Sequence, residues 1–178
     1  MDIGTLSTRY AKALLQYATK KHQEDNVYKD MDSMLHAFLH IPSLRHTLNN
    51  PVIKDEDKIQ LLLHSAGTAQ SVCTKDFIAL IVSKKRTDII SFMANSYLNQ
   101  YRKYKNITIG RLTTAYEMDA ENVKRLQEIV EQRCKGQVTF TVQKDESLKG
   151  GFILEYDTYR LDASLKEQLH RIRKGLSN

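Results

Sequence analysis

The chain has 178 residues, of which 41% are hydrophobic and 27% are charged, and its formal net charge is +6. This is the composition of an ordinary globular protein, and a mean hydropathy of -0.48 with no apolar run near ~18 residues argues against a membrane-embedded chain. The two cysteines, Cys73 and Cys134, fit neither a metal-binding nor a disulfide pattern, so we expect buried thiols in a reducing compartment.

The first part of the chain, residues 1–105, has the apolar spacing that is typical of helices. The protein has only two prolines, Pro42 and Pro51, and both fall at predicted helix boundaries. Short links join the predicted segments, which indicates an N-terminal six-helix bundle. The first four helices are expected at residues 5–21, 24–40, 42–48 and from the acidic residues 55–57 to about 66. The last two are expected at residues 74–85 and from Thr87-Asp88 to 104. Thr5 or Ser7 is expected to cap the first helix, and Thr87-Asp88 the sixth.

Two of these helices have more apolar surface than a single packing contact requires. The first helix has two apolar faces, and the fifth contains six consecutive apolar residues at 77–82. Such a helix is either central or keeps one face for a partner. The larger face of the first helix consists of Leu6, Tyr10, Ala13, Leu14 and Tyr17.

The apolar pattern changes from helical to strand period at Lys105-Asn106. The pattern of residues 106–178 predicts a small β-α-β-β-α domain, so that the whole protein is mainly α with a small α+β C-terminal domain. Strands are expected at 107–116, 138–142 and 152–156. A hairpin tip at Asp157-Thr158 leads into a short returning strand at 159–161. Helices are expected at 119–136 and after Ser164.

The segment from Lys149 onward organises this second domain. Gly150 and Gly151 are expected to take backbone angles that other residues avoid, in a turn before the strand. Ser164 and Glu167 have the spacing of a capping box at the start of the last helix. We expect the apolar face of that helix to pack chiefly on its own sheet, through Leu165, Leu169, Ile172 and Leu176.

No residue pattern in the chain predicts catalysis, a metal or a cofactor. His36 and His40 are spaced i, i+4, but no third ligand stands at a telling distance. Lys149-Gly150-Gly151 lacks the GxxxxGK[ST] pattern of a phosphate loop and leads into a strand. Cys73 has no evident base partner. We therefore predict no enzyme activity.

Basic clusters leave a nucleic-acid function open as the alternative. Residues 1–105 carry 15 Lys or Arg against 10 Asp or Glu, whereas residues 106–178 carry 12 against 11. The clusters are 84–86 and 101–105, and the second has interleaved tyrosines that could stack on bases. Tyr97, Tyr101 and Tyr104 also follow helical spacing, which favours a packed stripe. The alternative function is a basic RNA-associated two-domain protein.

Several short motifs occur along the whole chain. They are Arg9 to Leu14 (RYAKAL), Leu48 to Pro51 (LNNP) followed by Lys58, Lys84 to Arg86, Asp145, Ser147-Leu148, Gly150-Gly151 and Leu161 to Ser164 (LDAS). These motifs resemble, in the same order, those of the delta subunit family of F-type ATP synthases, which includes the mitochondrial oligomycin-sensitivity-conferring protein. Two residues depart from the family pattern, since Ala163 replaces a common glycine and Lys149 a common apolar residue.

The resemblance implies a non-catalytic stator subunit without cofactors, present once per complex and binding no nucleic acid. Residues 1–105 would hold the N-terminal segment of an alpha subunit in a groove between helices one and five, and residues 106–178 would contact the b subunits of the peripheral stalk. The protein would lie at the cytoplasmic face of the bacterial inner membrane, attached only through the complex. The groove residues are expected to be Tyr10, Ala13, Leu14, Phe77, Leu80 and Ile81, and the C-terminal structural motif Gly150, Gly151, Asp162 and Ser164.

Overall fold

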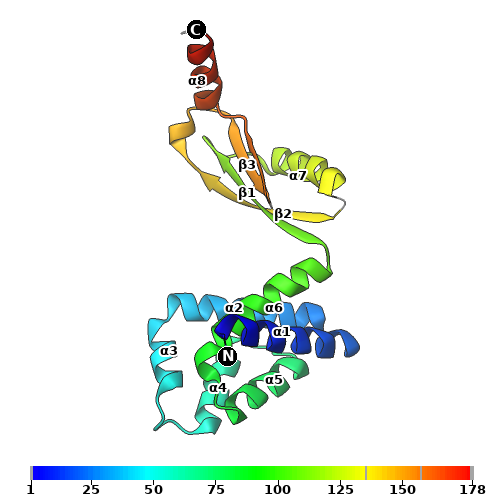
Figure 1. Ribbon diagram of the computed structural model, residues 1–178, viewed down its shortest axis with the longest axis vertical. Helices are drawn as coiled ribbons and strands as arrows, with labels where there is room; N and C mark the ends of the chain where they lie inside the picture. Colours follow the sequence, from blue (N-terminus) through cyan, green and yellow to red (C-terminus); the bar gives the residue numbers. More distant parts are fainter. Residues whose placement is uncertain (1, 135, 157, 177–178) are drawn as a thin grey trace. The chain divides into compact units, whose positions relative to one another are not determined.

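The computed structural model describes residues 2–134, 136–156 and 158–176 and divides the chain into two compact units. Unit 1 is Met1–Arg102 and unit 2 is Lys103–Asn178, a boundary three residues before the change of pattern in the sequence. The protein is mainly helical, and its four-stranded sheet lies in unit 2 (Figure 1). Within the described residues, no helix is both long and apolar enough to cross a membrane.

Unit 1 is helical throughout, with short connections between its helices. A 3-10 turn, η1 (Thr87–Ile89), precedes the last helix where the sequence predicts a simple cap. The helices are α1 (Ile3–Lys20), α2 (Glu24–His40), α3 (Pro42–Asn49), α4 (Asp55–Ser65), α5 (Val72–Ser83) and α6 (Ile90–Tyr104).

The predicted cap of the first helix is wrong. α1 begins at Ile3, and the Leu6 N–H already donates to the carbonyl of Asp2 at 3.1 Å, so Thr5 and Ser7 lie inside the helix. α5 also begins earlier than predicted, because the Ser71 hydroxyl accepts from the Thr74 N–H at 3.1 Å and caps it. A side-chain cap therefore starts α5 but not α1, because the N-cap residue Asp2 of α1 makes no side-chain capping hydrogen bond.

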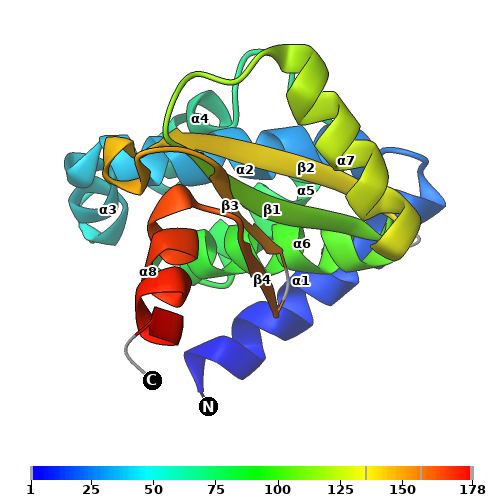
Figure 2. The same cartoon turned by 90° about the horizontal axis from the view of Figure 1, so that it is seen from above.

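Unit 2 consists of β1 (Ile107–Thr114), α7 (Ala120–Cys134), β2 (Gln137–Lys144), β3 (Phe152–Tyr156), β4 (Tyr159–Asp162) and α8 (Leu165–Leu176). The strands lie in the order β2-β1-β3-β4, with β1 and β2 parallel and the other pairs antiparallel (Figure 2). The predicted return at 159–161 is confirmed as a strand of its own, β4, so the full order is β-α-β-β-β-α, and the pattern β-α-β-β-α did not count it separately. The predicted hairpin tip includes Asp157, which lies outside the described residues.

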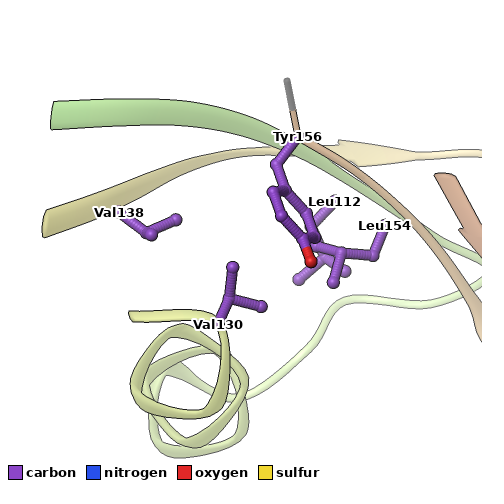
Figure 3. Packing of buried hydrophobic residues seen from close by; sticks show 5 residues of the cluster. All are labelled: Leu112, Val130, Val138, Leu154 and Tyr156. Carbon is purple, nitrogen blue, oxygen red and sulfur yellow. The ribbon is translucent and has the colours of Figure 1, made fainter. Parts of the chain in front are cut away.

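One face of the sheet carries the core of unit 2. Val130 of α7 points toward the sheet, where residues from three strands surround it (Figure 3). Alternate residues of each strand point to this side, as the period-2 pattern predicts. The buried strand residues are Leu112 of β1, Val138 of β2, and Leu154 and Tyr156 of β3.

The glycine turn before β3 differs in part from the prediction. Gly151 has a φ of 75°, but the other left-handed residue of the turn is Lys149, with a φ of 60°, rather than Gly150. Lys149 follows the 3-10 turn η2 (Glu146–Leu148), and helical turns commonly end on a left-handed residue. A side chain at Gly151 would collide with the carbonyl oxygen of Ala163, so this glycine is required by close approach as well as by φ.

The expected packing of α8 on its own sheet is wrong for the residues that can be described. Leu165 is 42% exposed and Leu169 is 51% exposed. In Figure 1, α8 stands beyond the ends of the strands rather than across them. The side chains of Ile172 and Leu176 lie outside the described residues.

Candidate protein-binding site on the first and fifth helices

Helices α1 and α5 contact each other and are joined by a side-chain hydrogen bond. The Tyr17 hydroxyl of α1 donates to Oδ2 of Asp76 on α5 at 2.8 Å. This bond, more than partial burial, raises the pKa of Tyr17, so the hydroxyl stays protonated and able to donate. The bond therefore joins the exposed sides of the two helices.

The six predicted groove residues divide into a surface set and a supporting set. Ala13 and Leu80 are exposed, Leu80 to 45%, and Tyr10 is half-buried. The other three lie beneath them in the core and have exposures of 6% or less. These buried residues are Leu14, Phe77 and Ile81.

Sequence reasoning missed part of the exposed apolar surface. Tyr17 is 36% exposed, and the prediction placed it on the apolar face of the first helix but not among the groove residues. Val72 is 58% exposed. Val72 and Leu80 are spaced i, i+8, so they lie on one side of α5. Val72 was missed because it precedes the predicted start of the helix. We call Tyr10, Ala13, Tyr17, Val72 and Leu80 the α1–α5 surface.

A buried carboxylate holds the N-terminal end of α5. Oδ2 of Asp30 on α2 accepts from the Ser71 N–H at 2.9 Å and from the Thr74 hydroxyl at 2.7 Å. Asp30 is 6% exposed, and a buried charge is tolerated where hydrogen bonds and a helix N-terminus stabilise it. The neighbouring Cys73 is buried, and burial raises the pKa of its thiol, which disfavours the reactive thiolate.

The tyrosines of the last helix of unit 1 do not form a base-stacking surface. Tyr97 is fully buried and its hydroxyl donates to the carbonyl of Glu24 at 3.1 Å. Tyr101 is 7% exposed and donates to Oδ1 of Asp25 at 2.8 Å. Tyr104 is 53% exposed. Two of the three rings therefore pack α6 against α2, and Tyr104 is the one of the three that stays exposed for stacking.

The histidine pair does not form a metal centre. The rings of His36 and His40 stack at 6.1 Å between centroids, and Nε2 of His36 lies 3.9 Å from Oδ2 of Asp32. Across the described part of the chain, no group of three or more His, Cys, Asp or Glu residues could hold a metal ion.

The C-terminal motif residues meet where the turn before β3 contacts the start of α8. The Ser164 hydroxyl accepts from the Glu167 N–H at 3.2 Å, which confirms one of the two bonds of the predicted capping box. The Ser164 N–H donates to Oδ1 of Asp162 at 3.0 Å, and the Leu165 N–H donates to the carbonyl of Gly150 at 2.9 Å. Their role is to join β4 to α8.

Residues from two of the other motifs line one pocket of about 460 Å³ in unit 1. Leu48, Asn49 and Pro51 come from the LNNP segment, and Lys58 lies on α4. Lys85, from the motif Lys84 to Arg86, also lines the pocket. The spaced motifs therefore form one local structure beyond the C-terminal end of α5.

Known proteins match this chain over nearly its whole length. The family described as ATP synthase delta (OSCP) subunit matches residues 6–176. "ATP synthase subunit delta" of Phocaeicola vulgatus is 42% identical over 175 residues, which cover 98% of this chain and 95% of the relative. The protein of the same name from Parabacteroides distasonis is 39% identical over 176 residues, covering 99% of this chain and 98% of the relative.

A solved structure shows the same fold. The match is a chain in the cryo-EM structure of the Toxoplasma gondii mitochondrial ATP synthase hexamer, with a TM-score of 0.67 and 23% identity. The match covers 97% of this chain and 98% of that one. Because the family match and the relatives extend over nearly the whole sequence, the chain belongs to the ATP synthase delta (OSCP) subunit family, whose members are non-catalytic accessory subunits.

Proposed function

We propose that this protein is a stator subunit of a bacterial F-type ATP synthase, tying the catalytic head to the peripheral stalk. It resists the torque of rotation, so that rotor motion drives the catalytic sites instead of turning the head. Membership of the delta (OSCP) family supports this role. The protein acts as one copy per complex at the cytoplasmic face of the inner membrane, and it meets the membrane only through the complex.

In this proposal, helices α1 to α6 act as one six-helix bundle that binds the N-terminal segment of an alpha subunit. The observation that carries it is the α1–α5 surface: apolar side chains stay exposed on two helices that contact each other. An amphipathic helix can bury such a stripe with anchors at i, i+3, i+4 and i+7. The buried Leu14, Phe77 and Ile81 support the surface from below.

Unit 2 contacts the b subunits of the stalk. A stator must hold two bodies at once, and two linked binding sites retain their partners better than either alone when the link spans them. The division of the chain into two compact units supports this separation of tasks.

The test uses the full-length protein and a labelled peptide with the N-terminal sequence of alpha from the same synthase. Ala13→Asp and Leu80→Asp place a charge at exposed positions, so the fold is retained while an apolar partner would have to desolvate the charge. We expect each variant to weaken peptide binding at least about tenfold in fluorescence anisotropy. Circular dichroism checks that the helices remain.

Phe92→Asp is the matched control, because Phe92 lies on α6 and is 50% exposed, close to the 45% of Leu80. The control should bind the peptide like the wild type. Wild-type affinity in both A13D and L80D, or an equal loss in F92D, would contradict the assignment of the alpha segment to the α1–α5 surface.

A further inference from the structure

A carboxylate lies in the middle of the apolar residues that α5 contributes to the α1–α5 surface. Asp76 follows Val72 by four residues and precedes Leu80 by four, so the three side chains lie on one side of α5. At a rise of about 1.5 Å per residue, Asp76 is about 6 Å along the helix from each of them. Asp76 is exposed, as Val72 and Leu80 are. One charge therefore interrupts the apolar stripe of α5.

The carboxylate of Asp76 has unused capacity to accept hydrogen bonds. Its Oδ2 accepts from the Tyr17 hydroxyl at 2.8 Å, whereas an ionised carboxylate has about four acceptor positions. In the part of the chain that the structure describes, no Lys, Arg or His lies within ion-pair distance of Asp76. The Lys21 ammonium lies over the Tyr17 ring, 6.0 Å from its centre. Because Asp76 is exposed, water can reach the remaining acceptor positions in the free protein.

A partner helix that covers the α1–α5 surface excludes this water. An ionised carboxylate is costly to bury in an apolar contact unless new hydrogen bonds or an opposite charge replace the water. The Tyr17 hydroxyl has one proton to donate and already donates it to Asp76, so it cannot compensate further. The partner must therefore bring a donor, and a Lys or Arg side chain supplies both hydrogen bonds and the opposite charge.

We infer that Asp76 is a specificity-determining residue of the α1–α5 surface and pairs with a Lys or Arg side chain of the bound alpha segment. With the bound helix running along α5, this cation has apolar residues three or four positions away on both sides, in contact with Val72 and Leu80. The pair also sets the register, because a shift by one turn would place Asp76 against an apolar residue. This inference rests on the proposed function, in which the α1–α5 surface binds alpha.

The first test measures binding of the labelled alpha peptide to full-length variants by fluorescence anisotropy. Asp76→Asn removes the charge but keeps an oxygen that can accept from Tyr17, and it should weaken binding at least about tenfold. Asp76→Leu should weaken binding at least as much, because the cation of the peptide then faces an apolar side chain. A surface that recognises apolar residues alone would instead bind the peptide equally well or better in D76L.

Asp32→Asn is the matched control for the loss of one negative charge. Asp32 lies on α2 and its side chain is 44% exposed, so this variant should bind the peptide like the wild type. Circular dichroism checks that all three variants keep their helices.

A double-mutant cycle identifies the partner residue. Each Lys or Arg of the alpha peptide is replaced by Gln in turn, and every peptide is measured against the wild type and D76N. One replacement should weaken binding to the wild type at least about tenfold but change binding to D76N by less than about twofold. Glu at that peptide position should restore at least about tenfold of the affinity that Asp76→Lys loses.

The outcomes separate this inference from the function on which it rests. Wild-type protein that fails to bind the alpha peptide would overturn the proposed function, and the inference with it. Peptide binding that A13D and L80D weaken but D76N and D76L do not would overturn only the role of Asp76. An equal loss in D32N would do the same, as would a cycle in which no single cation of the peptide couples to Asp76.

Discussion

Replacing Asp30 with alanine tests whether one buried carboxylate holds α5 in place. Its Oδ2 accepts two hydrogen bonds, and each bond to a charged group contributes about 1.5–3 kcal/mol. The Thr74 hydroxyl keeps a neighbour in Oγ of Ser71 at 2.8 Å, so the Ser71 N–H bears most of the loss. We expect Asp30→Ala to lower the free energy of unfolding by about 2–4 kcal/mol.

Urea unfolding of the full-length protein, followed by circular dichroism, measures this loss. Hydrogen exchange locates it, because the amides of α5 should exchange about 30-fold faster or more if the first turn of the helix opens. Binding of the alpha peptide should weaken in the same variant, since the α1–α5 surface depends on the position of α5.

Asp32→Ala is the matched control, two residues along the same helix. The Asp32 side chain is 44% exposed and its Oδ2 lies 3.9 Å from Nε2 of His36, so the loss should stay below about 0.5 kcal/mol. Equal losses from D30A and D32A would refute the reasoning. So would faster exchange that is spread evenly over unit 1 rather than centred on α5.

Two further predictions concern unit 2. Gly151→Ala should destabilise it by about 1–3 kcal/mol or more in urea unfolding, because φ is 75° and an added methyl group would meet the backbone of Ala163 and Ser164. Gly150→Ala should cost less than about 1 kcal/mol, since its Cβ would lie 3.6 Å from Leu165 Cβ; equal losses would show that the turn tolerates both residues alike. Hydrogen bonds from the Val138 N–H at 3.0 Å and the Gln127 amide at 3.2 Å lower the pKa of Glu131. The resulting stabilisation is present above the usual glutamate pKa of about 4.3 and is lost as the pH falls through the lowered pKa. Glu131→Gln should therefore lose less stability than the wild type between about pH 5 and pH 3, and parallel pH curves would contradict this.

Local pattern was enough to predict most of the secondary structure and the lack of catalytic motifs. Helical and strand spacing depends on neighbouring residues alone, so it indicated the helices of unit 1 and the switch to strands after residue 105. The Ser164 cap was predictable for the same reason, because its hydroxyl bonds the N–H three residues later. The start of α1 was not, since the helix begins upstream of the candidate cap residues.

Only the tertiary structure decided which apolar residues remain exposed. Helical spacing groups Tyr10, Ala13 and Leu14 on one side of α1, but contact with other helices buries Leu14 and leaves Ala13 exposed. The partners of Asp30 are 41 and 44 residues away, and no local pattern predicts a bond over that separation.

The same limit explains the error over α8. An amphipathic stripe shows that a helix has something to cover, but not whether its own sheet or another chain provides it. In this protein, the packing of α7 along β2 and the direction in which α8 leaves β4 keep Leu165 and Leu169 exposed. The sequence by itself determined the stripe, and the arrangement of the surrounding elements decided that Leu165 and Leu169 stay exposed.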